Sequence, residues 1–570
     1  MINWDIKSSD ISLVRKLQRE FNTSEIIASV MANRNIQSLN DSKSFFSPDL
    51  RQLHDPELML NMDLASSTVA DYIESNKKIV VFGDYDVDGI TGSSMLSLFL
   101  AEAGANPEIY IPDREKEGYG LSKNGIDYAK NYGADLIITC DCGINAFEQV
   151  EYANELGINI IITDHHTPDK KLPDALAILN PKQVGCQYPF KGLCGGGVAF
   201  KLAASVAEKL NLDPEIVHKH LDLITLGTAA DIVPLIDENR TLVYYGLERM
   251  SNSDKPGIKA LLDISGLSEK ELTVGRLVFQ LAPRINAAGR MGDANNAAKL
   301  LTTNSSQEAI ELVNFIDQEN IIRQSIQANM VNEAILKVNA EVDLDTEHAI
   351  VLWEENWHAG VIGIVASRIK DEYSRPVVVI SMKGDEGKGS ARSIKGFDLY
   401  EHLSNCSEYL DGFGGHPMAA GLTISATYLE KFKSAFIESA NECLSKEMLV
   451  KSLDIEGEMT LNSIDPRFMN FLKKLGPFGP GNMRPQFASR DITVSGTPKI
   501  VGNGNHLKFS ARQNGVVYDA IGFNLSDHYE DLINGEPVDI AYVVEENEWQ
   551  GVSRIQLNLR DIKQKRESNS

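Results

Sequence analysis

Cysteine is scarce in this chain, and long apolar runs are absent. The six cysteines among 570 residues form no C-x-x-C pair of the kind that holds zinc. They are also too few for a disulfide framework, which favours a reducing compartment. No apolar stretch approaches the roughly 20 residues that cross a bilayer, and residues 1–5 lack the basic and apolar segments of a signal peptide. We therefore expect a cytoplasmic protein with no membrane association.

Basic residues are scarce relative to acidic ones. Lys and Arg number 55 against 80 Asp and Glu, which gives a formal net charge of −25. Proteins that bind nucleic acid usually present a basic face, so the total charge alone argues against a phosphate-rich partner. Binding depends on the local field rather than on the sum, however, and bound divalent cations would neutralise part of the excess acid. The charge therefore leaves a nucleic-acid partner open.

The chain is too long for a single core, and a prior of about 150 residues per domain predicts three or four domains. From about residue 70 to 235, apolar strands alternate with helical stretches, which predicts a parallel, doubly wound α/β sheet. Ligands of such sheets bind beyond the carboxyl ends of the strands. Residues 307–338 contain no Gly or Pro, and we expect them to form one long connector helix.

Two further domains are predicted after the connector. A strand beginning at 348 opens a second α/β unit, and short strands with Gly and Asn turns from about 452 predict a small β-barrel. The predicted parts, in chain order, are an N-terminal segment of helices and loop (1–65), the doubly wound domain (66–238), a helical connector (239–342), the second α/β domain (343–450), the barrel (451–562) and a polar tail (563–570).

Three predicted strands of the first domain each run into an aspartate. The motifs that follow them are Asp84-Tyr85-Asp86-Val87-Asp88-Gly89, Asp141-Cys142-Gly143 and Asp164-His165-His166. Carboxylates and imidazoles crowded along one rim of a sheet repel each other unless cations lie among them. Carboxylate ligands with one or two imidazoles suit Mn²⁺ or Mg²⁺. The rim therefore predicts a metal site.

The first motif has an alternative interpretation as a calcium loop. D-x-D-x-D-G opens an EF-hand loop, but the twelfth position here is Met95 instead of Glu, and the motif follows a buried strand. We expect Asp84, Asp86 and Asp88 to alternate along an extended segment and to point the same way, with Gly89 allowing a tight turn into a helix. Each motif alone also fits a solvated turn or a strand-end cap, whereas three at successive strand ends favour metal.

The number of acidic ligands exceeds what a single ion needs. Two ions a few ångströms apart stabilise the attacking and leaving oxygens of an in-line phosphoryl displacement and generate hydroxide from bound water. The residues alone therefore predict a metal-dependent hydrolase of phosphate esters.

These motifs resemble those of the DHH phosphoesterase superfamily, and Gly227–Leu235 is similar to its fourth motif. The resemblance extends along nearly the whole chain. Many members have a His four residues before the first metal-binding Asp, where this chain has Phe82, a gap that Asp84 would fill. The metal ligands that we predict with this resemblance are Asp84, Asp86, Asp88, Asp141 (as a bridge), His165 and Asp231, in a site for two Mn²⁺ or Mg²⁺ ions. Direct catalytic roles are predicted for Asp141, His165, His166 and His416, and an orienting role for Asp164.

Two segments of the second α/β domain resemble the domain that accompanies DHH domains. Trp357–Arg368 begins a helix rich in small residues, and Gly412–Gly421 is predicted to be a glycine-rich loop around His416. Either segment alone also fits close helix packing. Together they imply a domain that closes over the metal site, where glycine backbone approaches phosphate and His416 binds the scissile phosphate or stacks with a base.

The resemblance also implies which residues bind substrate. Gly389–Ser393 resembles the segment that grips a 5′ end, so that Ser390 and Arg392 would contact the 5′ phosphate. Arg114 and Arg290 match other basic positions near the nucleotide. Taken singly, each arginine also fits an ordinary surface ion pair.

The C-terminal barrel resembles an OB-fold. Phe509, Tyr518 and Phe523 would stack with bases, while Lys508 and Arg512 attract the backbone. The alternative is that these aromatic side chains form the core of the barrel itself.

The resemblance implies a monomeric single-strand-specific 5′→3′ DNA exonuclease of recombination and repair, which releases 5′-mononucleotides. Its partners would be single-stranded DNA with a 5′ end, a single-strand-binding protein and a helicase. The alternatives are a DHH phosphodiesterase of short oligonucleotides or cyclic dinucleotides, a family II inorganic pyrophosphatase, and a non-catalytic DNA-binding replication factor on the same scaffold. The long connector and the barrel favour a long strand, and the intact acidic set favours catalysis.

Overall fold

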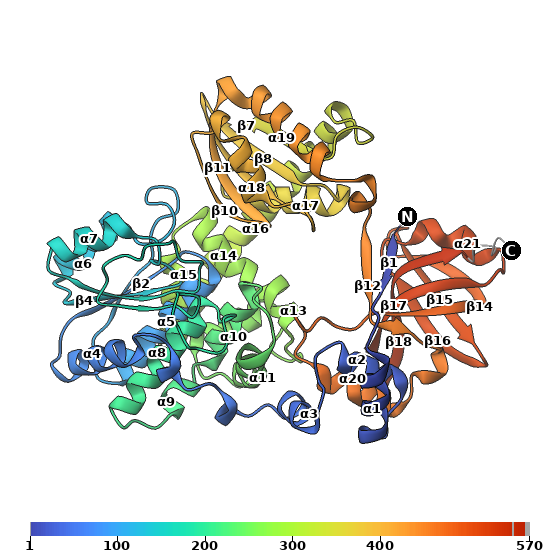
Figure 1. Cartoon of the computed structure of the whole chain (residues 1–570), viewed down its shortest axis with the longest axis horizontal. Coiled ribbons are helices and arrows are strands. Elements are labelled where there is room, and N and C mark those ends of the chain that lie inside the picture. Colours follow the sequence, from blue (N-terminus) through green and yellow to red (C-terminus); the bar gives the residue numbers. More distant parts are fainter. Residues whose placement is uncertain (1, 550–551, 565–570) are drawn as a thin grey trace. The chain divides into compact units, whose positions relative to one another are not determined.

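The computed structural model describes residues 2–549 and 552–564, and Figure 1 shows its ribbon. Most of the predicted tail, from 565 onward, lies outside the described residues. The chain divides into two compact units. The larger comprises Leu50–Leu449 and Gly479–Gly481, and the smaller comprises Met1–Asp49, Val450–Phe478 and Asn482–Ser570. Among the described residues, no helix has the length and apolar character needed to cross a membrane.

The first sheet of the larger unit is parallel throughout. Its strand order is β3-β2-β4-β5-β6, and its strands are β2 (Ile79–Gly83), β3 (Glu108–Tyr110), β4 (Leu136–Cys140), β5 (Asn159–Thr163) and β6 (Ala177–Leu179). The central strands are continuous apolar runs that are buried along nearly their whole length, as expected when helices cover both faces. The predicted doubly wound domain is confirmed.

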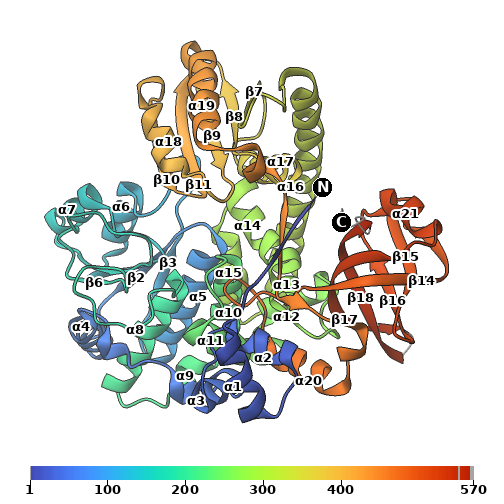
Figure 2. The ribbon, with the colours of Figure 1, turned by 45° about the vertical axis from the view of Figure 1, so that its right-hand side comes forward.

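Helices cover both faces of this sheet. Successive side chains of a strand point to opposite faces, and here both sets are apolar and buried. Val81 and Ile138 pack with one helical layer, and Val80 and Ile137 pack with the other. Figures 1 and 2 show α6 and α7 on one side of the sheet and α4 and α8 on the other. The helices of the domain are α4 (Met62–Glu74), α5 (Val87–Glu102), α6 (Lys123–Tyr132), α7 (Phe147–Glu155), α8 (Gly195–Lys209), α9 (Glu215–His218) and α10 (Leu221–Ala230).

The segment after β2 differs from the prediction. Asp86 is the N-cap of α5 and accepts hydrogen bonds from the backbone N–H of Asp88 (2.8 Å) and Gly89 (3.1 Å), so Asp88 lies in the first helical turn. The expected extended alternation of three aspartates is therefore wrong. Gly89 is needed for close approach instead of a turn, because a Cβ there would lie 2.6 Å from the backbone of Asp84.

A helical region follows, and it ends in the predicted connector. α16 runs over 36 residues and begins at the cap Ser305, whose hydroxyl accepts from the N–H of Glu308 at 3.3 Å. The helices of this region are α11 (Asp237–Ser251), α12 (Pro256–Ile264), α13 (Val274–Arg276), a π-helical turn (Leu277–Leu281), α14 (Ala282–Met291), α15 (Asn295–Thr302) and α16 (Ser306–Glu341).

The second sheet has the order β10-β11-β9-β8-β7 and is mixed, because only β7 and β8 run parallel. The predicted glycine-rich loop Gly412–Gly421 is instead a β-hairpin, in which His416 pairs with Ala419 across the turn. The elements are β7 (Ile350–Glu355), β8 (Val377–Lys383), β9 (Glu386–Arg392), β10 (Gly412–His416), β11 (Ala419–Ser425), α17 (Ile362–Tyr373), α18 (Leu399–Asn405) and α19 (Leu429–Cys443).

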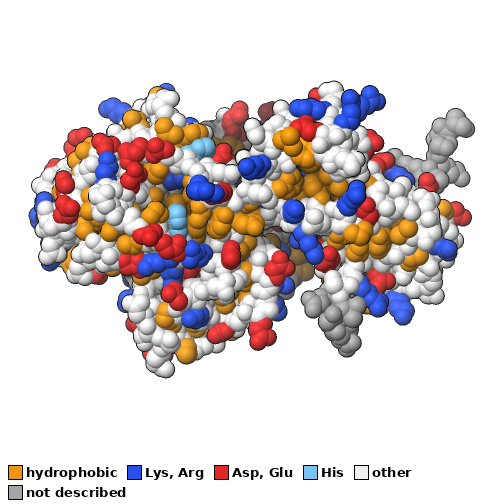
Figure 3. Space-filling model, turned by 90° about the horizontal axis from the view of Figure 1, so that it is seen from below, with side chains coloured by type: hydrophobic (Ala, Val, Ile, Leu, Met, Phe, Trp, Pro, Cys, Tyr) orange, Lys and Arg blue, Asp and Glu red, His pale blue; other side chains and the backbone are white. Residues whose placement is uncertain are grey.

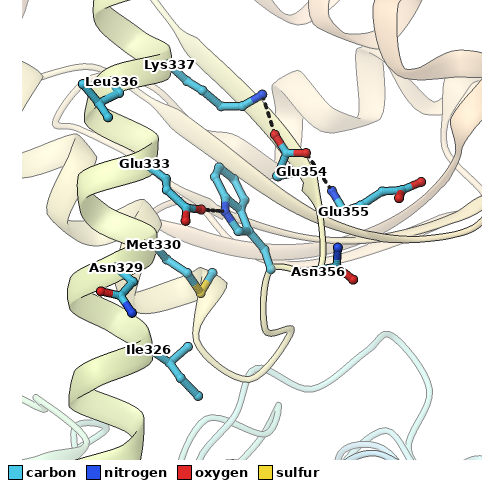
Figure 4. A pocket seen from close by; sticks show the side chains of 10 residues that line it. Ile326, Asn329, Met330, Glu333, Leu336, Lys337, Glu354, Glu355 and Asn356 are labelled. Atoms are coloured by element: carbon cyan, nitrogen blue, oxygen red, sulfur yellow. Dashed lines mark hydrogen bonds and ion pairs between the residues drawn. The ribbon is translucent and has the colours of Figure 1, made fainter.

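The connector helix shares a core with this second sheet. Met330, Ala334 and Val338 of α16 are buried in one cluster with residues of β7, β8 and α17. Figure 4 shows polar contacts beside it, such as the ion pair between Lys337 and Glu354 at 2.9 Å. The Trp357 indole N–H also donates to Glu333 at 2.9 Å. They flank a pocket of about 660 Å³ between α16 and the end of β7. The connector is thus an integral support of the second domain.

The smaller unit is a β-barrel. Its sheet has the order β13-β14-β15-β16-β18-β17, and β14 also pairs with β17, which closes it. Its elements are β12 (Ser452–Ile455), β13 (Gly457–Glu458), β14 (Phe487–Val501), β15 (His506–Gln513), β16 (Val516–Gly522), β17 (Val538–Trp549), β18 (Val552–Gln564), α20 (Pro466–Leu475) and α21 (Tyr529–Ile533).

The N-terminal segment belongs to this smaller unit. Helices α1 (Ile11–Phe21), α2 (Glu25–Ala32) and α3 (Leu39–Phe46) are present as expected. The segment also contains a strand, β1 (Asn3–Ile6), that pairs in parallel with β12, which the prediction of helices and loop missed. Leu17 and Val30 share a core with Phe468 of α20. Packing of the chain's beginning against its end was not foreseen.

A buried polar cluster joins α8 to α11 in the larger unit. The Lys201 ammonium pairs with Glu238, and both side chains are at most 2% exposed. Lys201 also donates to the carbonyl of His54 at 2.9 Å, and the Tyr188 hydroxyl donates to the second Glu238 oxygen. Removing one partner of a buried ion pair leaves an uncompensated charge.

We predict that Lys201→Met lowers the free energy of unfolding of the larger unit by about 3–5 kcal/mol, because Glu238 stays buried without its counter-ion. Urea unfolding followed by circular dichroism measures the change. Lys209→Met is the matched control. Lys209 lies on α8, like Lys201, but its ion pair with Asp63 of α4 is exposed, so the unfolding midpoint should stay unchanged. Equal midpoints for the two variants would contradict the expectation.

Candidate metal centre and phosphate-binding residues

Acidic residues follow three adjacent strands of the first sheet, as predicted. Asp84, Asp141 and Asp164 come directly after β2, β4 and β5. The register carries on past the strands, since the N–H of Asp141 donates to Thr163 and the N–H of Asp164 donates to Leu179, at 3.0 and 3.1 Å. The strand ends are therefore level, and the three carboxylates lie on one rim.

The rim contains overlapping groups of side chains with the spacing of metal ligands. Three sets have ligand atoms within 4.8 Å of one another: Asp141, His165 and His166; Asp88, His165 and Asp231; and Asp84, Asp86 and Asp141. His165 Nε2 lies 3.2 Å from Asp141 Oδ1 and 3.5 Å from Asp231 Oδ2. All six residues predicted as metal ligands thus occur in these sets, and Asp141 belongs to two of them.

Several donor atoms of this cluster have no partner. Asp84 Oδ1, Asp141 Oδ1, Asp231 Oδ2 and both ring nitrogens of His165 are buried, and none forms a hydrogen bond with the described residues. An unsatisfied buried polar atom costs on the order of 1–3 kcal/mol, so a cluster of them requires a reason. Carboxylate oxygens and neutral imidazole are the donors that Mn²⁺ and Mg²⁺ sites use, and the residues therefore fit such ions.

Two acids of the cluster, Asp141 and Asp231, favour their protonated forms when no cation is present. Burial, and next the charge of Asp88, raise the pKa of Asp141 well above its usual range. The same two causes raise the pKa of Asp231 to about 9. Burial and the neighbouring His166 lower the pKa of His165 to about 3, so its ring is neutral and keeps a lone pair for a metal.

Asp164 differs from Asp84, Asp141 and Asp231 because hydrogen bonds within the protein satisfy both of its oxygens. Its two oxygens accept from the N–H groups of Ile144 (2.9 Å), His165 (2.7 Å) and His166 (3.0 Å) and lie 2.8 Å from the Nδ1 of His166. Burial raises the pKa of Asp164, but the bonds from His166 outweigh it and the net shift is downward. This geometry suits the orienting role predicted for Asp164.

Glycines of α8 hold the rim, and the sequence interpretation missed them. The N–H groups of Gly195 and Gly196 donate to the two oxygens of Asp88, at 2.6 and 3.1 Å, from the N-terminus of the helix. A Cβ on Gly195 would lie 2.4 Å from the Cβ of Asp141. The run Cys194-Gly195-Gly196-Gly197 at a helix start was the available signal.

Tyr119 is a second residue that was missed. Its hydroxyl donates to the backbone carbonyl of Asp141 at 2.9 Å and lies 3.2 Å from the Nδ1 of His166. Asp141 has a φ of 63°, a left-handed conformation that costs energy in a non-glycine residue. The Tyr119 contact therefore helps to hold a strained residue at the centre of the cluster.

The second domain contributes His416, Ser390 and Arg392, and α14 of the preceding helical region contributes Arg290. The His416 ring stacks near His166, with centroids 6.3 Å apart and planes at 12°. The Arg392 guanidinium donates to the Ser390 hydroxyl at 3.0 Å. Arg290 donates to the carbonyl of Gly360 at 2.9 Å. The structure thus brings His416 to the metal cluster, as predicted.

The predicted substrate arginines have no acidic partners. Arg114, Arg290 and Arg392 form no ion pair within the described ranges 2–549 and 552–564, which argues against the interpretation as surface ion pairs. Burial, together with the charge of Arg114, lowers the pKa of Arg290 to about 10. The same two causes lower the pKa of Arg392. Like charges gathered without counter-ions are typical of an anion site.

Two further residues flank this group of arginines. The guanidinium of Arg114 lies 5.0 Å from the centre of the Tyr85 ring. Arg323 of α16, which the sequence did not point to, is 7% exposed, and among the described residues its side chain bonds only to the neutral side chains of Asn320 and Gln327. Its charge acts on Arg290. Figure 3 shows acidic and basic side chains interspersed over one face of the molecule, without a broad basic surface. An anion would therefore be attracted by a local group of arginines.

The aromatic residues of the barrel have different surroundings. Phe509 is 4% exposed and lies in the core, as in the alternative interpretation. The Tyr518 hydroxyl donates to the carbonyl of Ile464 at 2.8 Å. Phe523 is 50% exposed and packs edge-on to His506. Lys508 and Arg512 are exposed on β15. Of the three aromatic side chains, Phe523 is therefore the most exposed and the one best placed to stack with a base.

Comparisons with known proteins match every part of this architecture. The DHH family, N-terminal domain matches residues 78–228, the DHHA1 domain matches 346–446, and the RecJ OB domain matches 455–561. The single-stranded-DNA-specific exonuclease RecJ of Bacillus subtilis (strain 168) is 38% identical over 562 residues, which are 98% of this chain and 70% of that protein. The predicted resemblance to the DHH superfamily and to an OB-fold is confirmed.

Solved structures agree with the fold and with the choice of metals. RecJ from Thermus thermophilus in complex with Mn²⁺ is similar with a TM-score of 0.84 and 29% identity, over 99% of this chain and 80% of that one. The same protein in complex with Mg²⁺ gives a TM-score of 0.80 and 27% identity, over 99% and 79% of the two chains.

We predict that the metal-free protein loses thermal stability as pH rises from 6 to 8.5, and that Mg²⁺ removes much of this loss. Asp231 has a folded pKa of about 9 against an ordinary value of 3.8. When the folded-state pKa of an acid is raised, its contribution to the stability of the fold is fully present below the unfolded-state pKa. That contribution is lost as the pH rises through the folded-state pKa. A bound cation replaces the proton, because it favours the ionised carboxylates.

Melting temperatures in EDTA and in Mg²⁺ at both pH values measure this effect. Asp231→Asn should have a shallower pH slope in EDTA, since it removes the titrating group. Asp169→Asn, at an exposed acid of the loop after β5, is the control and should retain the wild-type slope. Parallel slopes with and without Mg²⁺ would refute the link between the cluster and cations.

Proposed function

The chain belongs to the RecJ family of single-stranded-DNA-specific exonucleases, and we propose that it hydrolyses single-stranded DNA from the 5′ end with two divalent cations. The observation that carries the proposal is one arrangement of charge. A buried cluster of unsatisfied carboxylate and imidazole atoms has beside it a histidine of the second domain. The first domain, the helical region and the second domain each add an arginine without an acidic partner among the described residues. Cations complete the first group, and the phosphates of a strand complete the second.

The residues proposed to hold the ions follow from the three ligand sets. Asp88, His165 and Asp231 would bind one ion, and Asp84 and Asp86 would bind the other, with Asp141 between them. When bound, Mn²⁺ or Mg²⁺ supplies hydroxide near neutral pH and neutralises charge on the phosphate. Asp164 orients His166 through its hydrogen bond, as a partner of a ligand does in many metal sites.

Polarity is proposed to come from the arginine group. Arg114, Arg290 and Arg392, with the Ser390 hydroxyl, would bind a terminal 5′ phosphate, for which guanidinium groups provide paired N–H donors. His416 would contact the scissile phosphate from the side of the second domain. Holding the terminal phosphate at a fixed distance from the ions would release one 5′-mononucleotide in each cycle.

The cellular setting is also a proposal. An enzyme of this family would act in DNA recombination and repair in the cytoplasm, on strands that a helicase opens and a single-strand-binding protein covers, and as a monomer. All six cysteines are free thiols, which suits a reducing compartment.

We expect purified protein with Mn²⁺ to degrade long 5′-labelled single-stranded DNA to mononucleotides, at rates at least about tenfold above those for dinucleotides or pyrophosphate. The reason is that a strand with a 5′ phosphate engages both the arginines and the metal rim. Asp141→Ala should abolish activity, because it removes the acid common to two ligand sets. Faster hydrolysis of dinucleotides or pyrophosphate would instead favour the other DHH activities, and strand binding without hydrolysis would favour a replication factor.

We expect Arg392→Gln to raise the KM for 5′-phosphorylated single strands about 10- to 100-fold, which corresponds to the loss of about 1.5–3 kcal/mol from a hydrogen bond to a charged group. The KM for strands with a 5′ hydroxyl should change little. Arg368→Gln alters an exposed arginine of α17 in the same domain and is the control. The role in end recognition is disproved if Arg392→Gln affects both kinds of strand equally.

A further inference from the structure

Lys182 is a cation at the rim of the metal cluster. β5 and β6 are parallel neighbours, with Thr163 opposite Leu179. The chain after β5 continues into Asp164, His165 and His166, and the chain after β6 continues into Asn180, Pro181 and Lys182. β2, β4 and β5 thus lead to acids or imidazoles, whereas β6, the last strand of the rim, leads to a lysine.

Side-chain hydrogen bonds fix the turn that carries Lys182. The Asn180 amide donates to the backbone carbonyl of His166 at 2.9 Å, and its oxygen accepts from the N–H of Lys182 at 2.8 Å. Gln183 donates back to the carbonyl of Ile178 at 2.8 Å. One amide therefore ties the lysine backbone directly to that of the histidine motif, and the position of Lys182 relative to the cluster is set.

The ammonium group of Lys182 is not used within the protein. Among residues 2–549 and 552–564 it makes no ion pair and no side-chain hydrogen bond, although the charges of three acids act on it. Burial lowers its pKa, against the charges of Asp231, Asp164 and Asp141. A lysine that only balanced these acids would be expected in contact with one of them.

The charge of Lys182 is also felt on the side of the second domain. Burial, the charge of His166 and then that of Lys182 lower the pKa of His416. Lys182 is therefore near enough to the acidic rim and to His416 for its charge to act on both. Neighbouring groups desolvate its ammonium in part, but Lys182 keeps enough exposed surface for a ligand to reach it.

We propose that the Lys182 ammonium binds a non-bridging oxygen of the scissile phosphate, beside His416. The inference rests on the proposed function and adds a contact to it. Lysine offers a compact charge with three donors and no acceptor, and it is a common phosphate ligand. A cation already in place at the reacting phosphate stabilises charge that increases in the transition state, without reorganisation during the reaction. The terminal 5′ phosphate remains with the arginines.

The test compares Lys182→Met, Lys182→Arg and Lys171→Met with the wild type on a saturating 5′-phosphorylated single strand in Mn²⁺. Lys171 is exposed on the loop between β5 and β6 and is the matched control. We expect Lys182→Met to lower kcat about 100-fold, Lys182→Arg to recover at least about a tenth of the wild-type rate, and Lys171→Met to match the wild type. Ethylamine should restore activity to Lys182→Ala but not to Asp141→Ala.

Mn²⁺ affinity, measured by electron paramagnetic resonance titration, separates phosphate binding from charge balance. The inference expects the affinity of Lys182→Met to stay within about twofold of the wild type. A loss of affinity that parallels the loss of rate would overturn it, because Lys182 would then act through the ions. Wild-type activity in Lys182→Met would overturn it while the proposed function stands. An inactive wild-type protein would overturn the proposed function and this inference together.

Discussion

Mutual repulsion of buried carboxylates is the constraint on which the larger unit depends. Adjacent parallel strands that end at the same level bring the residues that follow them close together. Here those residues include several acids, which repel one another. Much of the surrounding structure serves to hold them together. The N-terminus of α8 binds Asp88, α5 begins on Asp86, and Tyr119 holds the strained Asp141. The scaffold is therefore built to keep anions close until cations join them.

Two sets of unsatisfied charge explain how so acidic a chain fits a polyanion. The net charge of −25 counts the acids of the rim without their ions. Arg114, Arg290 and Arg392, from three parts of the larger unit, lack acidic partners among the described residues and so keep their attraction for phosphate. Arg323 adds to this group from the middle of a helix that otherwise supports the second domain. The local positive charge of these arginines, rather than the negative net charge of the chain, therefore determines whether phosphate binds there.

Features that depend on residues close together in the sequence could be predicted, and features that depend on distant residues could not. An apolar run that ends in an aspartate is a local pattern, so the sheet, its rim and the first-domain ligands were predictable. Asp86 as a helix cap was missed because D-x-D-x-D-G suits an extended strand equally well. The contact of Gly195 with Asp88 spans 107 positions, and no local pattern encodes it. Lys182 was missed because nothing in an Asn-Pro-Lys turn indicates that a histidine motif lies beside it. Composition predicts a loop for the glycine-rich segment, whereas strand pairing makes it a hairpin.

The pairing of β1 with β12 makes the larger unit an insertion within the smaller one. Lys7 and Glu456 form an ion pair across 449 positions of the chain, at 3.0 Å. During synthesis the N-terminal strand emerges first but must wait for its partner until the whole metal-binding unit has been made. That unit can fold in the interval, as domains generally do during translation. The closing of the barrel unit then joins the two ends of the chain, a late step of high contact order. A ribosome that stopped before residue 450 would leave an almost complete larger unit and an N-terminal segment without its core.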